Sequence, residues 1–303
     1  MTTLVKALDT EASAGSIHTP RERVCSHTGM RRPSLPRIPL TPGRPLLPSA
    51  RRISVILVWL VAAMLLAGCA GLQPKASPDQ REAAEINAEL GISYLRQNDL
   101  LQAERALERA IQFDPRLAMA HLGMASLRER QDLLDPALEH YRKALALDPD
   151  DPYVQTNLGD LLCRQGEIAE GRALLEKAAA NPSYRARHVA LVGAGVCALK
   201  AGETERAERR IREALEIAPR FPGALYEMAR LTYQDGRPFQ TRAFLSRLTA
   251  LGVVTPESLL LCYRAEMELG NREDALRCAQ RLMRDFTESE EAAELERLEQ
   301  GRG

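Results

Sequence analysis

Residues 111–115, Ile-Gln-Phe-Asp-Pro, are followed 34 positions later by a closely similar phrase, Leu-Ala-Leu-Asp-Pro, at residues 145–149. When the chain is aligned on the two prolines, small and apolar residues coincide at fixed offsets: Gly91 with Ala125, Ala103 with Ala137, Leu107 with Tyr141 and Ala110 with Ala144. Self-similarity with a period of roughly 20–50 residues is the sequence signature of a repeat protein. The two phrases therefore predict a chain built from a recurring unit of this length.

The same offsets recur along most of the chain and define six predicted units. Their boundaries are 84–117, 118–151, 152–187, 188–221, 222–255 and 256–290. The first four units share five or more of the offsets, whereas the fifth has Thr241 and Leu248 where the other units have small residues. An ordinary helical bundle with accidental spacing is the alternative, and so many shared positions disfavour it.

Each unit has the features of two antiparallel helices joined by a tight turn. Apolar residues at i, i+3, i+4 and i+7 give each helix one buried stripe. A Gly or Asn near the centre, such as Asn98 or Gly166, can take the left-handed conformation that ends a helix. Small residues at the eighth, twentieth and twenty-seventh positions allow the two backbones to approach. Since one hairpin cannot bury both of its faces, neighbouring hairpins must stack.

This pattern resembles the tetratricopeptide repeat over about residues 84–290. The resemblance implies an all-α protein, a right-handed superhelical solenoid of about six helix pairs. Before it we expect a disordered Pro/Arg-rich extension (1–50), a signal segment (51–68) and a linker (69–83), and after it a C-terminal tail (291–303). The true start is either Met1 or Met30.

The signal segment contains an uncharged apolar run, 53–67, preceded by Arg51-Arg52 and ending at Leu66-Ala-Gly-Cys69. A positive region, a short apolar run and small residues before the cut are typical of secretory signals. The ending resembles the bacterial lipobox, which implies cleavage before Cys69 and lipid attachment to it. Ala70 favours the outer membrane, periplasmic face, by analogy with lipoprotein sorting. A retained transmembrane anchor is the alternative, but the run is shorter than the roughly 20 residues that span a bilayer.

The charges of the chain are distributed unevenly although they cancel in total, with 41 basic and 41 acidic residues. Nine basic and only three acidic residues precede Cys69, so the remainder carries a net charge of −6. The sequence shows no basic stripe that phosphates would follow, and we therefore expect no nucleic-acid binding.

Stacked repeats curve, and the first helices of the pairs line the concave face. By resemblance to the tetratricopeptide family, positions 2, 5, 9, 12 and 13 of each unit point into that groove. The apolar residues predicted there are Ala88, Ile92, Leu95, Met119, Leu122, Tyr153, Val189, Val192, Val196, Leu199, Tyr226, Tyr233 and Leu260. Such a groove suits an apolar strand or an amphipathic helix of a partner protein. The alternative is that some of these residues are core between repeats.

Four cysteines follow the lipid-attachment site and suggest two disulfides. Cys163 and Cys197 fall on the first helices of adjacent units, where a bridge would contribute about 3 kcal/mol in an oxidising compartment. Cys262 and Cys278 fall on opposing helices of the sixth unit. Buried free thiols are the alternative for both pairs.

No residue pattern predicts an enzyme, a cofactor site or a metal site. The five histidines have no metal-ligand spacing, and neither a Gly-rich phosphate loop nor a nucleophile elbow occurs. His121 beside Asp160 or Glu129 resembles an acid–base pair, but repeat surfaces are rich in such neighbours. We expect no small-molecule substrate.

Several features together resemble one family. These are the lipobox, the six units, Leu-Cys-Arg-Gln-Gly at 162–166, Ala-Asn-Pro-Ser-Tyr-Arg at 180–185, and Gly-Val-Cys-Ala-Leu-Lys-Ala-Gly at 195–202. They resemble the PilF/PilW lipoproteins of type IV pilus biogenesis and stability. The resemblance implies a pilotin that helps the outer-membrane secretin to localise and oligomerise. The alternative is an envelope lipoprotein that scaffolds peptidoglycan enzymes or proteases.

Overall fold

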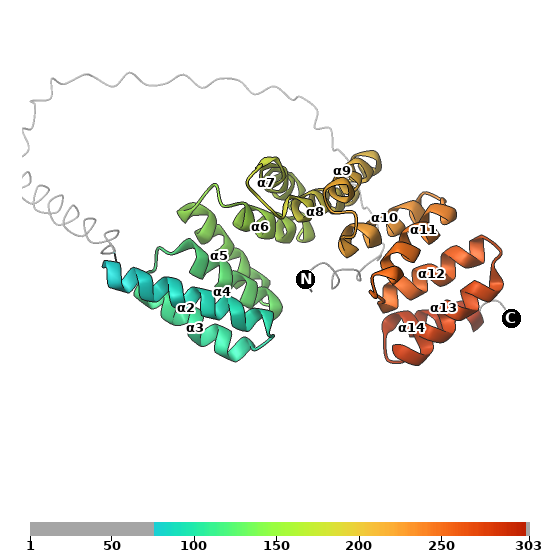
Figure 1. The fold of residues 1–303 in the computed structure, drawn as a ribbon, viewed down its shortest axis with the longest axis horizontal. Coiled ribbons are helices and arrows are strands. Elements are labelled where there is room, and N and C mark those ends of the chain that lie inside the picture. Colours follow the sequence, from blue (N-terminus) through green and yellow to red (C-terminus); the bar gives the residue numbers. More distant parts are fainter. Residues whose placement is uncertain (1–75, 301–303) are drawn as a thin grey trace, which may run out of the picture. The chain divides into compact units, whose positions relative to one another are not determined.

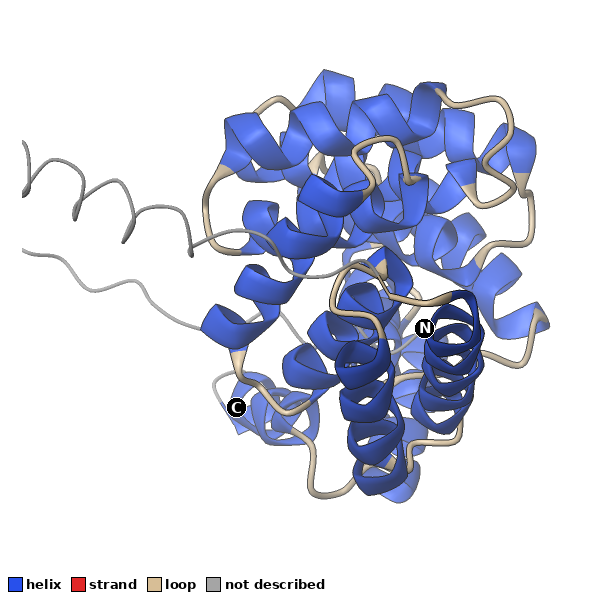
Figure 2. Cartoon of the chain, turned by 90° about the vertical axis from the view of Figure 1, so that its left-hand side faces the viewer, coloured by secondary structure: helices blue, strands red, loops and turns tan. Residues whose placement is uncertain are grey.

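The computed structural model describes residues 76–300, and these residues form helices connected by short turns, with no strand among them. The all-α prediction is confirmed over this part of the chain (Figures 1 and 2). The predicted N-terminal extension, the signal segment and the lipid-attachment site Cys69 lie outside the described residues. Within residues 76–300, no helix combines the length and the apolar composition needed to cross a bilayer.

Twelve of the helices form six consecutive antiparallel pairs, and a thirteenth follows the last pair. The pairs are α2 (Pro78–Arg96) with α3 (Leu100–Phe113), α4 (Ala118–Arg130) with α5 (Leu134–Leu147), α6 (Pro152–Arg164) with α7 (Ile168–Ala180), α8 (Arg187–Lys200) with α9 (Thr204–Ile217), α10 (Pro222–Gln234) with α11 (Pro238–Ala250), and α12 (Pro256–Glu268) with α13 (Arg272–Asp285); α14 is Glu290–Gln300. In Figure 1 the pairs follow one another in chain order. The fold is therefore a tetratricopeptide array.

In every pair, the turn between the two helices contains a residue in the left-handed backbone conformation. These residues are Asn98, Asp132, Gly166, Gly202, Gly236 and Gly270, with φ between 60° and 90°. Glycine adopts this conformation without the penalty that a Cβ imposes, and Asn and Asp tolerate it better than most other residues. The prediction that residues such as Asn98 and Gly166 take the left-handed conformation between the two helices is thus confirmed.

The small residues of the repeat lie where two helix backbones touch. Ala137, Ala144, Ala207 and Ala214 are all fully buried. One close backbone contact joins Gly159 of α6 and Gly171 of α7: a Cβ placed on Gly171 would lie 2.6 Å from the carbonyl oxygen of Gly159. A larger side chain there would push the two helices apart.

The first helices of the pairs form the inner layer of the stack. α2 contacts α4, α6 contacts α8, α8 contacts α10, and α10 contacts α12. Each second helix instead contacts its own partner and the first helix of the next pair. Because the inner helices of a curved stack come closer together than the outer ones, the first helices line the concave face.

The two ends of the array differ from the boundaries expected from sequence. α2 begins at Pro78 rather than near residue 84, so the predicted linker (69–83) is wrong over its last six positions. Ser77 explains the earlier start, since its side chain and that of Gln80 form a reciprocal capping box around Pro78. At the other end, the predicted tail forms α14, whose Ala292 and Leu295 are buried.

Candidate partner-binding groove

The thirteen predicted groove residues divide into an exposed group and a buried group. Nine of them are partly or largely exposed on the first helices: Ile92, Met119, Leu122, Tyr153, Val189, Val196, Leu199, Tyr226 and Tyr233. They come from α2, α4, α6, α8 and α10, which form the inner layer. The structure therefore places a discontinuous series of apolar side chains along the concave face.

The other four predicted groove residues are part of the core and are corrected here. Ala88 and Val192 are fully buried, and Leu95 and Leu260 are each 4% exposed. They pack inside the clusters that hold neighbouring helices together; Ala88, for example, packs with Ala110 and Ala120. At these positions the helices approach too closely for a partner to reach the side chain.

An aromatic pair stands at the start of α6. Tyr153 is 52% exposed, and its ring meets the ring of the buried Tyr184 edge to face, with centroids 4.9 Å apart. Burial raises the pKa of Tyr184, partly offset by its hydrogen bond with Thr156. Tyr184 belongs to the extended loop after α7, so this loop supports an exposed aromatic side chain of the inner layer. Exposed aromatic residues backed by a packed neighbour are frequent anchors in protein interfaces.

A network of charged groups occupies the middle of the inner layer, between the apolar side chains. Arg164 on α6 forms ion pairs with Glu129 of α4 and Asp160 of its own helix. The Tyr141 hydroxyl donates a hydrogen bond of 2.8 Å to Glu129. Burial alone would lower the pKa of Arg164, but the two carboxylates outweigh it and raise that pKa. The groove is therefore not uniformly apolar.

Sequence reasoning missed a second feature of the same face. The final residues of the first four inner helices are all basic: Arg96, Arg130, Arg164 and Lys200. The expectation that the chain does not bind nucleic acid stays a prediction, but charges summed over the chain conceal this regular series. Aligning the last residues of alternate helices at the repeat period would have revealed it.

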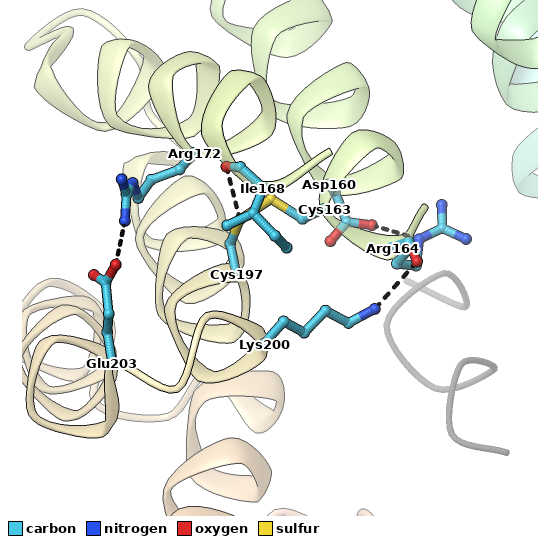
Figure 3. The surroundings of a disulfide bond; sticks show 8 residues. All are labelled: Asp160, Cys163, Arg164, Ile168, Arg172, Cys197, Lys200 and Glu203. Atoms are coloured by element: carbon cyan, nitrogen blue, oxygen red, sulfur yellow. Dashed lines mark hydrogen bonds and ion pairs between the residues drawn. A yellow bond between two sulfur atoms is a disulfide. The ribbon is translucent and has the colours of Figure 1, made fainter. Parts of the chain in front are cut away.

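The four cysteines of the array lie in the two predicted pairs. Cys163 and Cys197 are bonded across the junction of α6 and α8, with Cα atoms 5.4 Å apart (Figure 3). Cys262 and Cys278 are bonded between α12 and α13, with Cα atoms 6.1 Å apart. The first bond joins adjacent repeats, whereas the second joins the two helices of a single repeat.

The histidine considered as an acid–base candidate has a different environment from the one expected. The buried His121 contacts neither Asp160 nor Glu129 through its ring nitrogens; its Nδ1 lies 3.1 Å from Nδ1 of His140, and its Nε2 lies 3.0 Å from the carbonyl oxygen of Pro115. Burial lowers the pKa of both histidines. Among residues 76–300, no group of three or more His, Cys, Asp or Glu side chains is arranged to hold a metal ion.

Comparisons with known proteins agree with this architecture. Models described as tetratricopeptide repeat match residues 84–117 and 156–220, and one described as TPR repeat matches residues 134–166. The chain is 28% identical over 250 residues to the type IV pilus assembly protein PilF of Pseudomonas aeruginosa, a match that covers 80% of this chain and 98% of that protein.

Two solved structures match at similar length. The crystal structure of PilW, described as a widely conserved type IV pilus biogenesis factor, has a TM-score of 0.65 and 30% identity, covering 70% of this chain and 97% of PilW. The structure of P. aeruginosa PilF has a TM-score of 0.63 and 27% identity, covering 72% of this chain and 98% of PilF. Nearly the full length of each relative is therefore represented in this chain.

The repeat architecture, the inner layer with its exposed side chains and the near-complete coverage of both relatives lead to one conclusion. This chain belongs to the PilF/PilW family of tetratricopeptide-repeat proteins, which are interaction scaffolds of type IV pilus assembly rather than enzymes.

Proposed function

We propose that this protein is an outer-membrane lipoprotein that binds the secretin of the type IV pilus through its concave face and promotes the localisation and oligomerisation of that secretin. The observation that carries the proposal is the series of partly exposed apolar side chains on the inner helices, in an array that spans 97% of PilW and 98% of PilF. An apolar strand or an amphipathic helix of the secretin would bury these side chains.

The proposed lipid anchor explains how binding leads to assembly. Cys69 and the start of α2 at Pro78 are separated by eight residues, which span at most about 30 Å when fully extended. Acyl chains on Cys69 would therefore keep the array, and any secretin subunit in its groove, close to the membrane surface. A high local concentration of subunits favours oligomerisation without covalent chemistry.

The groove is tested by introducing a charge on the inner layer and, as a matched control, the same charge on an outer helix. Leu122→Asp and Ile92→Asp place a carboxylate among the half-buried apolar side chains of α4 and α2. Leu101→Asp makes the corresponding change on α3, where Leu101 is 57% exposed. The amount of denaturant-resistant secretin multimer in outer-membrane fractions is the measurement, and circular dichroism checks that each variant is folded.

We expect the two inner-layer variants to reduce the multimer to the level of a deletion strain, and Leu101→Asp to leave it unchanged. Normal multimer in cells that carry folded Leu122→Asp and Ile92→Asp would rule out the groove as the secretin site.

The anchor is tested separately with Cys69→Ser. We expect this variant to leave the outer-membrane fraction and to lose incorporation of a labelled fatty acid. Retention of both properties would contradict lipid attachment at Cys69. A gene deletion scored for twitching motility tests the pilus role itself.

A further inference from the structure

The basic residues that end the first four inner helices form a regular series that the apolar groove does not explain. Arg96, Arg130, Arg164 and Lys200 close α2, α4, α6 and α8, and we call them the basic ladder. The equivalent residues of the fifth and sixth pairs are Gln234 and Glu268, so the ladder stops after the fourth repeat. It stands out because the chain after Cys69 carries a net negative charge.

Contacts between successive inner helices show that the ladder is continuous. Arg130 donates a hydrogen bond of 2.5 Å to the carbonyl oxygen of Leu95, next to Arg96. Arg164 is paired with Glu129, next to Arg130. Lys200 donates a hydrogen bond of 3.3 Å to the carbonyl oxygen of Arg164 (Figure 3). Arg130, Arg164 and Lys200 thus each contact the C-terminal end of the preceding inner helix. We call each of the four ladder residues a rung.

Most of the positive charge on the ladder is not neutralised. Within residues 76–300, Arg96 makes no hydrogen bond or ion pair, and the polar contacts of Arg130 and Lys200 are with backbone carbonyl groups. Only Arg164 has carboxylate partners, Glu129 and Asp160. Arg96, Arg130 and Lys200 are also exposed to solvent.

Helix electrostatics alone does not account for the series. A basic residue in the last turn of any helix is favoured by the helix dipole. The second helices are subject to the same effect, and α7, α11 and α13 do have a basic residue in their last turn, but none of the six second helices has a basic residue at its final position. The inner helices α10 and α12 also lack one. A basic final residue is therefore a feature of the first four inner helices and not of the helices of the pairs in general.

We infer that the basic ladder binds an acidic, extended segment of the partner protein, with one carboxylate for each of Arg96, Arg130 and Lys200, the ladder residues that form no ion pair within residues 76–300. Packed helices lie about 8–10 Å apart. A chain in the polyproline II conformation advances about 9 Å over three residues and presents every third residue on one edge. A segment with an acidic residue at every third position would therefore match successive rungs. The inference deepens the proposed function, on which it rests only for the identity of the partner as the secretin.

The ladder is tested with a peptide probe that needs no secretin. The probe is a peptide of four Glu-Pro-Pro triplets, and its control has Gln in place of Glu. Binding to the full chain in detergent is measured by fluorescence anisotropy at low and high salt. The test variant is Arg96→Glu with Arg130→Glu. The matched control, Arg105→Glu with Arg109→Glu, makes the same charge change at exposed residues of α3, which lies in the outer layer.

We expect the Glu peptide to bind more tightly than the Gln peptide, and the preference to decrease with salt. The ladder variant should weaken binding of the Glu peptide by about tenfold, because individual surface charges contribute modestly and two are reversed, whereas the α3 variant should not. Arg96→Glu alone, whose side chain makes no contact that supports the fold, should weaken binding in the same direction.

Equal binding of the two peptides, or equal weakening by the ladder and α3 variants, would overturn the inference. The proposed function fails through a different result: secretin multimers that assemble normally in a deletion strain. That result would leave a positive peptide measurement intact and would show that the acidic segment belongs to another partner.

Discussion

Residues at equivalent repeat positions are buried to different extents in two regions of the array. These regions are the junction of the third and fourth repeats and the N-terminal end. At the third position, Val154 of the third repeat is fully buried, whereas Ile86 of the first repeat is 57% exposed. At the seventh position, Leu158 is fully buried, whereas Leu90 is 42% exposed. The residue types are similar, so the difference comes from the preceding repeat, which the third repeat has and the first repeat lacks within residues 76–300.

This difference shows that stability in the array depends on neighbours as well as on each hairpin. In a linear array, the stability of a repeat is approximately its own contribution plus the contributions of its two interfaces. The third repeat has two interfaces, a disulfide to the fourth repeat and a close backbone contact between its own two helices, while α2 has one interface within the described residues. The C-terminal end resembles the junction more closely, since α14 covers α12 and α13.

The largest expected effect is removal of the junction disulfide. Cys163→Ala with Cys197→Ala releases a cross-link between residues 34 positions apart, and in the chain-entropy model this costs about 4 kcal/mol, somewhat more than the roughly 3 kcal/mol expected from the sequence. Cys262→Ala with Cys278→Ala releases one between residues 16 positions apart, at a cost of about 3 kcal/mol. Urea unfolding of the oxidised variants measures both values. A reducing agent that leaves the wild-type midpoint unchanged would contradict a contribution from either bond.

The next effect compares one substitution at one repeat position in the two regions. Leu158→Ala leaves a cavity in a fully buried site and should cost about 3 kcal/mol. Leu90→Ala removes a side chain that is already 42% exposed and should cost less than about 1 kcal/mol. Urea unfolding monitored by circular dichroism gives both values. Similar losses would mean that the face of α2 is covered by a part of the chain outside residues 76–300.

The fold could be predicted from the sequence because its determinants are local and periodic. A 34-residue period, small residues at contact positions and turn residues able to take positive φ all act within one hairpin or between neighbours. The groove was less predictable: a repeat position shows the direction of a side chain but not its depth, so Ala88 and Val192 were assigned to the surface although both are buried.

Other features were missed for different physical reasons. The early start of α2 follows from Ser77 and Gln80, a capping signal that is readable in the sequence but lies outside the repeat frame used to place the boundary. The basic ladder was hidden because opposite charges elsewhere cancel it in any total. The contact between His121 and His140 joins α4 to α5 through side chains that the repeat pattern does not constrain.

A smaller effect is expected from adding one methyl group at two glycines. Within the third repeat, Gly171→Ala places a Cβ 2.6 Å from the carbonyl oxygen of Gly159. Because the backbone cannot move aside easily, the cost should be about 2 kcal/mol. Near the N-terminal end, a Cβ on Gly123 meets only side-chain atoms of Leu107 and Ile92. There the helix propensity of alanine, worth about 1 kcal/mol, offsets most of the clash. Thermal unfolding distinguishes the two variants, and an equal loss would show that the Leu107 side chain is as rigid as backbone.

The smallest expected effect is a change of local stability with pH that has opposite sign in the second repeat and at the junction. Burial lowers the pKa of His121 and His140 in the second repeat, so the unfolded chain takes up protons first as the pH falls through about 6.5. The second repeat should therefore lose stability below that pH. At the junction, burial raises the pKa of Asp160 despite its ion pair with Arg164, so the folded chain takes up that proton first.

The contribution of Asp160 is therefore lost as the pH rises and regained as the pH falls toward its unfolded value. Hydrogen exchange resolved by region, compared between pH 7 and pH 5 after correction for intrinsic rates, should show a loss of protection at pH 5 in α4 and α5 and no such loss in α6. The double variant His121→Asn with His140→Asn should abolish the loss in α4 and α5 and should leave the exchange of α6 unchanged. A uniform response along the array would mean that the repeats unfold together, so that each titrating group affects the stability of the whole array. The contrast between the junction and the N-terminal end would then concern packing alone.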